Sequence, residues 1–108
     1  MMQIPDIERW SRMSLREQMA NNGSEVGRSA KWISKDKPQM AEGAFLRALD
    51  LIDLTIKTSR SGLDSRPALL KELCRCRELY CGAYLSCDID NLNYLDRYFG
   101  QFAKALRR

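Results

Sequence analysis

Apolar residues recur every three or four positions along almost the whole chain, which is the period of an α-helix. One such seam lies near the start of the chain: Leu15, Met19, Asn22, Val26, Ser29 and Ile33. A second lies in its later half: Leu69, Leu73, Cys76, Tyr80, Ala83 and Cys87. No long stretch alternates between apolar and polar residues, as a half-buried strand would. The pattern therefore predicts an all-α protein.

Capping signals divide this pattern into four predicted helices. Ser14 and Glu17 form a capping box, in which Ser14 accepts a hydrogen bond from the amide three residues on and Glu17 reaches back. Residue types that favour the N-cap position mark the later starts: Asp36, Ser65, and either Asp88 or Asp90. The predicted helices span residues 14–34, 37–59, 65–87 and 90–107. The segment before them is expected to lie across one end, anchored by Ile4, Ile7 and Trp10.

The length of 108 residues fits a single domain, residues 1–108. Four helices with short connections pack most naturally as an antiparallel up-down-up-down four-helix bundle. No apolar run approaches the roughly 18 residues of a membrane-spanning helix, and the N-terminus lacks the apolar core of a secretory signal. We therefore expect a cytoplasmic protein with no membrane partner.

The chain contains no histidine. This removes the commonest general base and excludes Ser-His-Asp and Cys-His catalysis within the chain. The four cysteines, Cys74, Cys76, Cys81 and Cys87, all fall on one predicted helix. Residues two apart on a helix point about 160° away from each other, so Cys74 and Cys76 are not arranged to chelate together. We expect core cysteines and neither a metal nor a cofactor, with a redox role for Cys87 as the alternative.

The net charge of +4 raises the question of nucleic-acid binding. The basic residues are spread along the chain without a block, which favours a solvated surplus over a binding groove. Trp32 falls on the polar side of its predicted helix, together with Gln18, Asn21, Glu25 and Arg28. The candidate contacts for a protein or nucleic-acid partner are Arg28, Lys31, Trp32, Arg75 and Arg77.

Charged residues of the first and third predicted helices allow two arrangements. Glu25, Arg28, Arg75 and Glu78 form either a solvated face or an interhelical network, and the sequence leaves both open. A minimal hydrolase is one alternative function. It would need three carboxylates to converge in a pocket: Glu25, Asp50 and Glu78.

Small residues are aligned within the first predicted helix. The dipeptide Asn22-Gly23 is a turn signal, but the helical period continues across it. The aligned positions are Ala20, Gly23, Gly27 and Ala30. Two glycines inside a helix cost about 1 kcal/mol each relative to alanine. The missing side chains allow another helix to approach closely, which offsets this cost. We therefore expect a close helix contact at these positions.

The order and length of the helices and the charged third helix make the chain similar to HEPN-type bundles and to the related nucleotidyltransferase-partner bundles. HEPN ribonucleases carry an arginine followed by a histidine, whereas Arg75 is followed at the corresponding positions by Tyr80, Cys81 and Gly82. The resemblance therefore implies a bundle without nuclease activity. We expect a small non-catalytic protein that acts by protein–protein interaction or self-association, not an enzyme. The alternative is a nucleic-acid-binding or toxin–antitoxin-type accessory bundle.

Overall fold

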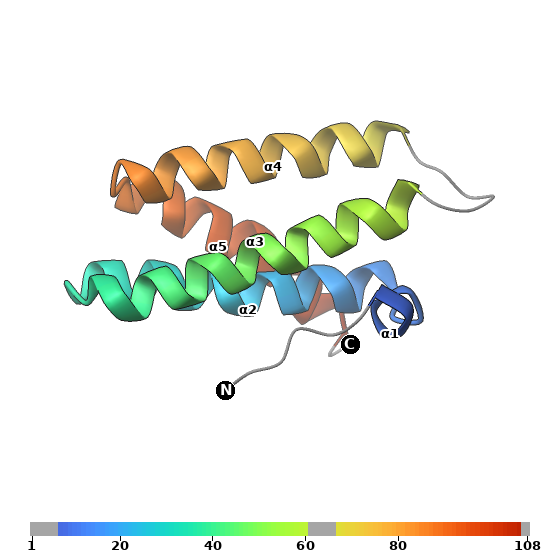
Figure 1. The fold of residues 1–108 in the computed structure, drawn as a ribbon, viewed down its shortest axis with the longest axis horizontal. Coiled ribbons are helices and arrows are strands. Elements are labelled where there is room, and N and C mark those ends of the chain that lie inside the picture. Colours follow the sequence, from blue (N-terminus) through green and yellow to red (C-terminus); the bar gives the residue numbers. More distant parts are fainter. Residues whose placement is uncertain (1–6, 61–66, 107–108) are drawn as a thin grey trace.

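The computed structural model describes residues 7–60 and 67–106, and within these ranges the chain forms five α-helices and no strand (Figure 1). The helices are α1 (Ile7–Ser11), α2 (Leu15–Ser34), α3 (Pro38–Arg60), α4 (Pro67–Leu85) and α5 (Ile89–Leu106). The prediction of an all-α protein is confirmed. No helix of the described part of the chain is long and apolar enough to cross a membrane.

The short helix α1 was not predicted as a helix. It lies at the end of the molecule where α2 begins (Figure 1). Trp10 is its anchor, because it is only 1% exposed and its indole Nε1 donates to Thr55 Oγ1 at 3.1 Å. Ile7 is exposed, so the prediction that it anchors this segment is wrong. Ile4 lies outside the described residues.

Side chains cap the starts of α2 and α5. Ser14 Oγ accepts a hydrogen bond from the backbone N–H of Glu17 at 3.1 Å, as predicted. Asp88, rather than Asp90, caps α5, because its Oδ1 accepts from the backbone N–H of Asn91 at 3.2 Å. Both contacts satisfy amides that have no partner within the helix.

The turns after α2 and α4 have the same geometry. Asp36 and Cys87 adopt left-handed backbone conformations, with φ of 56° and 54°. In each turn the next residue donates its amide to a carbonyl five positions back, Lys37 to Trp32 at 2.9 Å and Asp88 to Ala83 at 2.8 Å. These bonds are those of the Schellman motif, which closes a helix C-terminus.

This geometry corrects two predictions. Asp36 is not the N-cap of α3, since it closes α2 and α3 starts only at Pro38. The third predicted helix, residues 65–87, extends too far, because the left-handed Cys87 ends the helical hydrogen bonding and α4 stops at Leu85. The predicted cap Ser65 lies outside the described residues.

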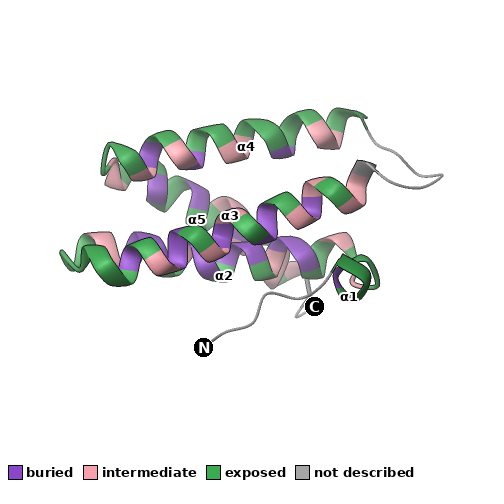
Figure 2. Cartoon of the chain, viewed as in Figure 1, coloured by how far each residue is buried: buried purple, intermediate pink, exposed green. Residues whose placement is uncertain are grey.

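Helix α2 lies at the centre of the packing, with its most extensive contacts to α5 and α3. Buried positions are concentrated on α2 and α3, whereas the described positions of α4 and α5 are mostly exposed or intermediate (Figure 2). Only three residues of α4 are buried: Leu73, Tyr80 and Ala83. The core cluster draws on all four long helices: Met19, Val26, Ala30, Phe45, Ala48, Ile52, Leu73, Tyr80, Ala83, Leu92, Leu95 and Phe99.

Candidate functional site: a buried glutamate and the α3–α4 face

Helix α2 carries a row of buried polar residues beside its apolar seam. The row consists of Gln18, Asn22, Glu25 and Ser29, all 5% exposed or less. Their spacing of four, three and four places them on one side of the helix. The prediction that Gln18 and Glu25 lie on a polar, solvent-facing side of α2 is therefore wrong. Each of the four finds a polar partner, which makes its burial tolerable.

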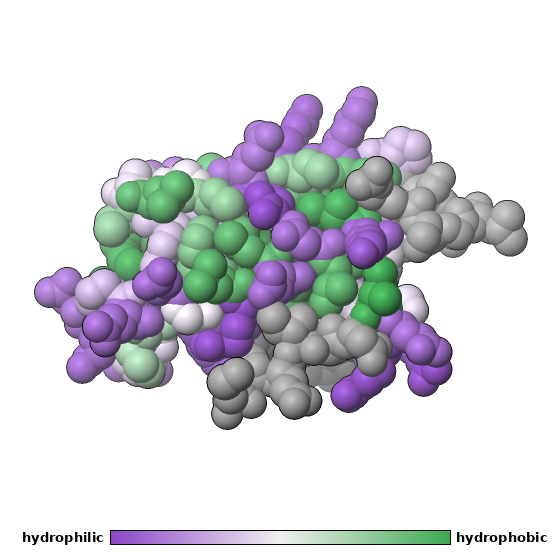
Figure 3. Space-filling view, in the orientation of Figure 1, coloured by the Kyte–Doolittle hydropathy of each residue, from purple (hydrophilic) through white to green (hydrophobic). Residues whose placement is uncertain are grey.

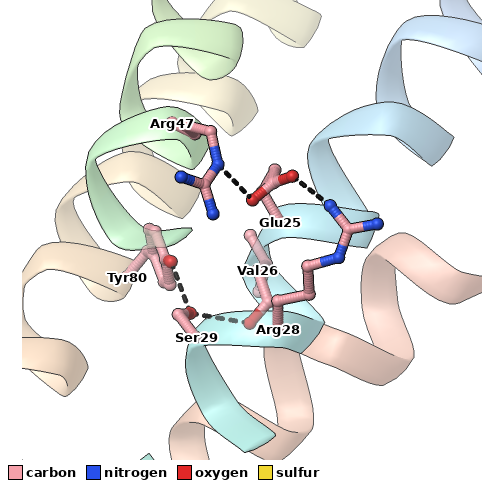
Figure 4. A network of polar contacts seen from close by, with 6 residues as sticks. All are labelled: Glu25, Val26, Arg28, Ser29, Arg47 and Tyr80. Atoms are coloured by element: carbon pink, nitrogen blue, oxygen red, sulfur yellow. Dashed lines mark hydrogen bonds and ion pairs between the residues drawn. The ribbon is translucent and has the colours of Figure 1, made fainter. Parts of the chain in front are cut away.

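Glu25 lies between two arginines, as Figure 4 shows. Its side chain is 1% exposed, while those of Arg28 and Arg47 are 52% and 35% exposed. Arg28 Nη1 donates to Oε1, and Arg47 Nε donates to Oε2 at 3.1 Å. Because Arg47 belongs to α3, the carboxylate joins two helices through charge-assisted hydrogen bonds.

The structure matches neither of the two arrangements that the sequence left open for Glu25, Arg28, Arg75 and Glu78 as a set. Glu25 and Arg28 belong to an interhelical network, but Arg75 and Glu78 are exposed on α4 and take no part in it. The missing partner is Arg47, which the sequence reasoning did not identify. Its position at the edge of the apolar arc of α3 was the available signal, because a long arginine there reaches a neighbouring helix.

A second contact joins the same stretch of α2 to α4. The Ser29 hydroxyl donates to the carbonyl of Val26 at 2.7 Å, and the hydroxyl of Tyr80 lies 2.6 Å from Ser29 Oγ (Figure 4). Since the serine proton is used, the tyrosine acts as the donor. Burial raises the pKa of Tyr80 above its ordinary value.

A third polar contact lies near α1. Asn22 Nδ2 donates to Thr55 Oγ1 at 3.1 Å, and the Thr55 hydroxyl donates to the carbonyl of Leu51 at 2.9 Å. Gln18 Nε2 donates to the carbonyl of Trp10 at 2.8 Å. Among the described residues, no buried side-chain nitrogen or oxygen lacks a hydrogen-bond partner. A fully partnered row of this kind fixes how helices align and presents no unpartnered acid or base.

The three carboxylates of the hydrolase alternative do not converge. Glu25 is buried on α2 and bound to arginines, whereas Asp50 and Glu78 are exposed on α3 and α4. General acid–base work requires such groups within hydrogen-bond reach of one reacting atom.

The aligned small residues of α2 lie against α5. An added Cβ on Gly23 would lie 2.6 Å from Phe99 Cβ, and one on Gly27 would lie 2.6 Å from Asp96 Oδ1. Ala30 is buried and Ala20 half-buried on the same side of the helix. Of the four positions for which a close helix contact was predicted, Ala20, Gly23, Gly27 and Ala30, the two glycines lie against Phe99 and Asp96 of α5, so their contact falls within the chain.

The five candidate partner contacts lie on two separate helices. Arg28 is bound to Glu25, and Arg77 Nε donates to Asp53 Oδ1 at 2.7 Å. Trp32 is half-buried, with the ammonium groups of Lys31 and Lys35 at 5.7 and 5.8 Å from its ring centroid. Arg75 is exposed on α4. Two of the four cations are therefore already occupied by carboxylates.

The cysteines divide into two kinds. Cys76 and Cys81 are half-buried and pack against the core, whereas Cys74 and Cys87 are exposed. The prediction of core cysteines is therefore wrong for Cys74, which is exposed on α4, and for Cys87, which lies in the turn after α4. Burial raises the pKa of the Cys76 thiol, which disfavours the reactive thiolate. The described residues contain no cluster of three or more side chains that could hold a metal ion.

A polar contact also links α4 to α5. The Tyr98 hydroxyl donates to Glu72 Oε1. Burial raises the pKa of Tyr98, and the bond to Glu72 raises it further because the carboxylate accepts the phenolic proton.

Apolar side chains remain at the surface where α3 lies beside α4. Figure 3 shows hydrophobic residues gathered over these two helices, with hydrophilic ones between them. Leu46 and Leu85 are 52% and 77% exposed. The Phe45 and Tyr84 rings stack at 3.9 Å, and with the Asp53–Arg77 ion pair they fix which sides of α3 and α4 adjoin. The α3–α4 face comprises Leu46, Asp50, Asp53 and Lys57 of α3 and Lys71, Cys74, Arg77, Glu78, Cys81 and Leu85 of α4.

The chain was compared with protein-family models, curated proteins and solved structures. No protein-family model, no curated protein and no solved structure matches the chain. The function must therefore be inferred from the chemistry and geometry of the chain's own residues.

Proposed function

We propose that this protein is a non-catalytic helical interaction module whose partner is a second copy of the same chain, bound through the α3–α4 face. The observation that carries this proposal is the exposure of Leu46 and Leu85 beside the half-buried Tyr84 and Cys81. Apolar side chains grouped at a surface and bordered by charges are typical of protein–protein contacts.

We infer that the four long helices form an up-down-up-down antiparallel bundle with α1 across one end. The contacts between α3 and α4 support this order, because Phe45 meets Tyr84 and Asp53 meets Arg77. Residue numbers fall along α4 as they rise along α3, as they do for antiparallel neighbours. The turn of residues 35–37 between α2 and α3 is short enough for the same arrangement.

A cytoplasmic location is part of the proposal. All four cysteines are unpaired in the structure. Unpaired thiols suit a reducing compartment, whereas secreted proteins of this size commonly form disulfides.

Sedimentation of the purified chain over a wide concentration range tests self-association. We expect a concentration-dependent oligomer that Leu46→Ser weakens. Met40→Ser is the matched control, since Met40 is equally exposed, at 52%, on α3 but outside the α3–α4 face. A chain that stays monomeric at every concentration overturns the proposal.

Nucleic-acid binding is the alternative function. It would rest on Lys31, Lys35 and Arg75, because Arg28 and Arg77 already have acidic partners. Binding of this kind weakens steeply with salt, since it releases counterions. A gel-shift assay at low salt with RNA and DNA distinguishes the two functions, and we expect no shift.

A further inference from the structure

We propose that the α3–α4 face is a two-fold symmetric interface, in which a second copy packs antiparallel with the symmetry axis passing beside the Asp53–Arg77 ion pair. This inference rests on the proposed self-association and adds its geometry. A two-fold interface requires a surface that is complementary to itself. The order of charges along α3 and α4 meets that requirement.

On α3 the relevant charges are Asp50 and Lys57, both exposed. They are seven residues apart, which is two helical turns, so they lie on the same side of the helix. An antiparallel copy rotated about the midpoint between them places each aspartate opposite the lysine of the other copy. That midpoint lies between residues 53 and 54.

On α4 the same spacing occurs with the charges in the opposite order. Lys71 and Glu78 are exposed and seven residues apart, with their midpoint between residues 74 and 75. Rotation about this point again places opposite charges together. The two helices therefore carry the same kind of self-complementary pair.

Both midpoints lie at nearly the same height along the molecule, so one axis serves both helices. The Phe45–Tyr84 and Asp53–Arg77 contacts place the midpoint of the α3 pair level with about residue 76 of α4. This differs from the α4 midpoint by at most two residues, or about 3 Å of helix rise. Flexible lysine and glutamate side chains span such a difference.

The Asp53–Arg77 ion pair lies beside this axis, with side chains 51% and 39% exposed. Two copies bring two such pairs together, and because residues at the axis face their own counterparts, each carboxylate stays balanced by the guanidinium of its own chain. Several pairs of opposite charge arranged about one axis fit a second copy, whereas a different partner would need no such symmetry.

Cys74 provides the sharpest test because it lies next to the axis. It is exposed and adjacent to the midpoint of Lys71 and Glu78. In the proposed dimer the two Cys74 side chains face each other, at a separation that disulfide geometry allows. Mild oxidation is expected to give a covalent dimer that Cys74→Ser abolishes. Cys87→Ser is the control, since Cys87 is also exposed but lies beyond the end of α4, and the covalent dimer should persist.

Charge reversal tests the same geometry without relying on a thiol. Lys71→Glu is expected to weaken association about tenfold, because it replaces two attractive pairs by repulsive ones. Adding Glu78→Lys in the same chain restores opposite charges and should restore association. Lys31→Glu is the control, since this exposed lysine lies on α2.

The outcomes distinguish the two-fold arrangement from the proposed self-association on which it rests. A wild-type chain that never associates contradicts self-association itself. A dimer that forms no Cys74 cross-link and is unaffected by Lys71→Glu contradicts only the two-fold α3–α4 arrangement.

Discussion

At the scale of single residues, Glu25 is the most consequential side chain of the core. A buried carboxylate is unfavourable unless charged or polar groups surround it, and here two arginines from different helices do so. Both arginine side chains are partly exposed to solvent. The ion pairs of Glu25 therefore join a buried carboxylate to partly exposed arginines, and the one with Arg47 links α2 to α3.

Glu25→Gln should lower the free energy of unfolding by about 1.5–3 kcal/mol, the range for hydrogen bonds to charged groups. The amide retains the shape of the side chain but leaves Arg28 and Arg47 without a balancing charge. Urea denaturation measures the loss. Glu42→Gln is the matched control, because Glu42 is exposed on α3. Equal stability of the two variants would contradict the role of Glu25.

The tyrosines Tyr80 and Tyr98 predict how stability depends on alkaline pH. Their pKa values are raised in the folded chain above the ordinary 10.0, in both cases chiefly by burial. The folded state therefore keeps these protons when the unfolded chain loses them. Their contribution is complete below pH 10.0 and is lost as pH rises above it. Thermal unfolding should show a shallower alkaline decline for Tyr80→Phe, and an unchanged slope would contradict this linkage.

Sequence reasoning could not identify the buried polar row. The seam of α2 predicted the burial of Asn22 and Ser29, but Gln18 and Glu25 lie beside it and looked solvent-facing. Their burial depends on partners such as Arg47, which is 22 positions away in the chain. Periodicity within one helix contains no information on which residue of another helix will lie opposite.

At the scale of elements, α2 determines how closely its neighbours approach. Its glycines allow α5 to pack against its backbone, and its polar row engages α3 and α4. The buried arc of α2 is consequently broader than its apolar seam. The seams themselves predicted the long helices, whereas the five residues of α1 are too few to show a helical period.

Gly23→Ala and Gly27→Ala should differ in stability, although both add one methyl group to α2. The methyl on Gly23 meets Phe99 Cβ, which is fixed to the backbone, so the helices must separate at a cost of about 1–3 kcal/mol. The methyl on Gly27 meets the Asp96 carboxylate, which can rotate away, and alanine favours the helix by about 1 kcal/mol. Urea denaturation should rank Gly27→Ala above Gly23→Ala, and the reverse order would refute this packing.

Cys87→Gly should raise the free energy of unfolding by about 1 kcal/mol. Cys87 is left-handed, with φ of 54°, a conformation that costs most residues about 1–2 kcal/mol and glycine very little. Ser86→Gly next to it is the control and should not stabilise the chain. The Schellman turns after α2 and α4 were not predicted, because their left-handed residues are Asp36 and Cys87 and not the glycine that usually marks such a turn.

At the scale of the whole molecule, α4 makes fewer contacts with its neighbours than α2, α3 or α5 does. It has three buried residues and is held through the Phe45–Tyr84 stack and the Asp53–Arg77 and Tyr98–Glu72 contacts. The sequence indicated a helical protein, but which helix faces lie side by side depends on tertiary packing. The α3–α4 face could therefore be defined only from the structure.

Amide NMR spectra recorded over a dilution series test the central claim most directly, because they report association and its location together. Concentration-dependent shifts should be confined to the α3–α4 face, with Asp50, Cys74 and Glu78 among the most affected residues. The amides of Lys31 and Trp32 on α2 should not shift. Spectra that are independent of concentration, or shifts centred on Trp32, would contradict association through α3 and α4.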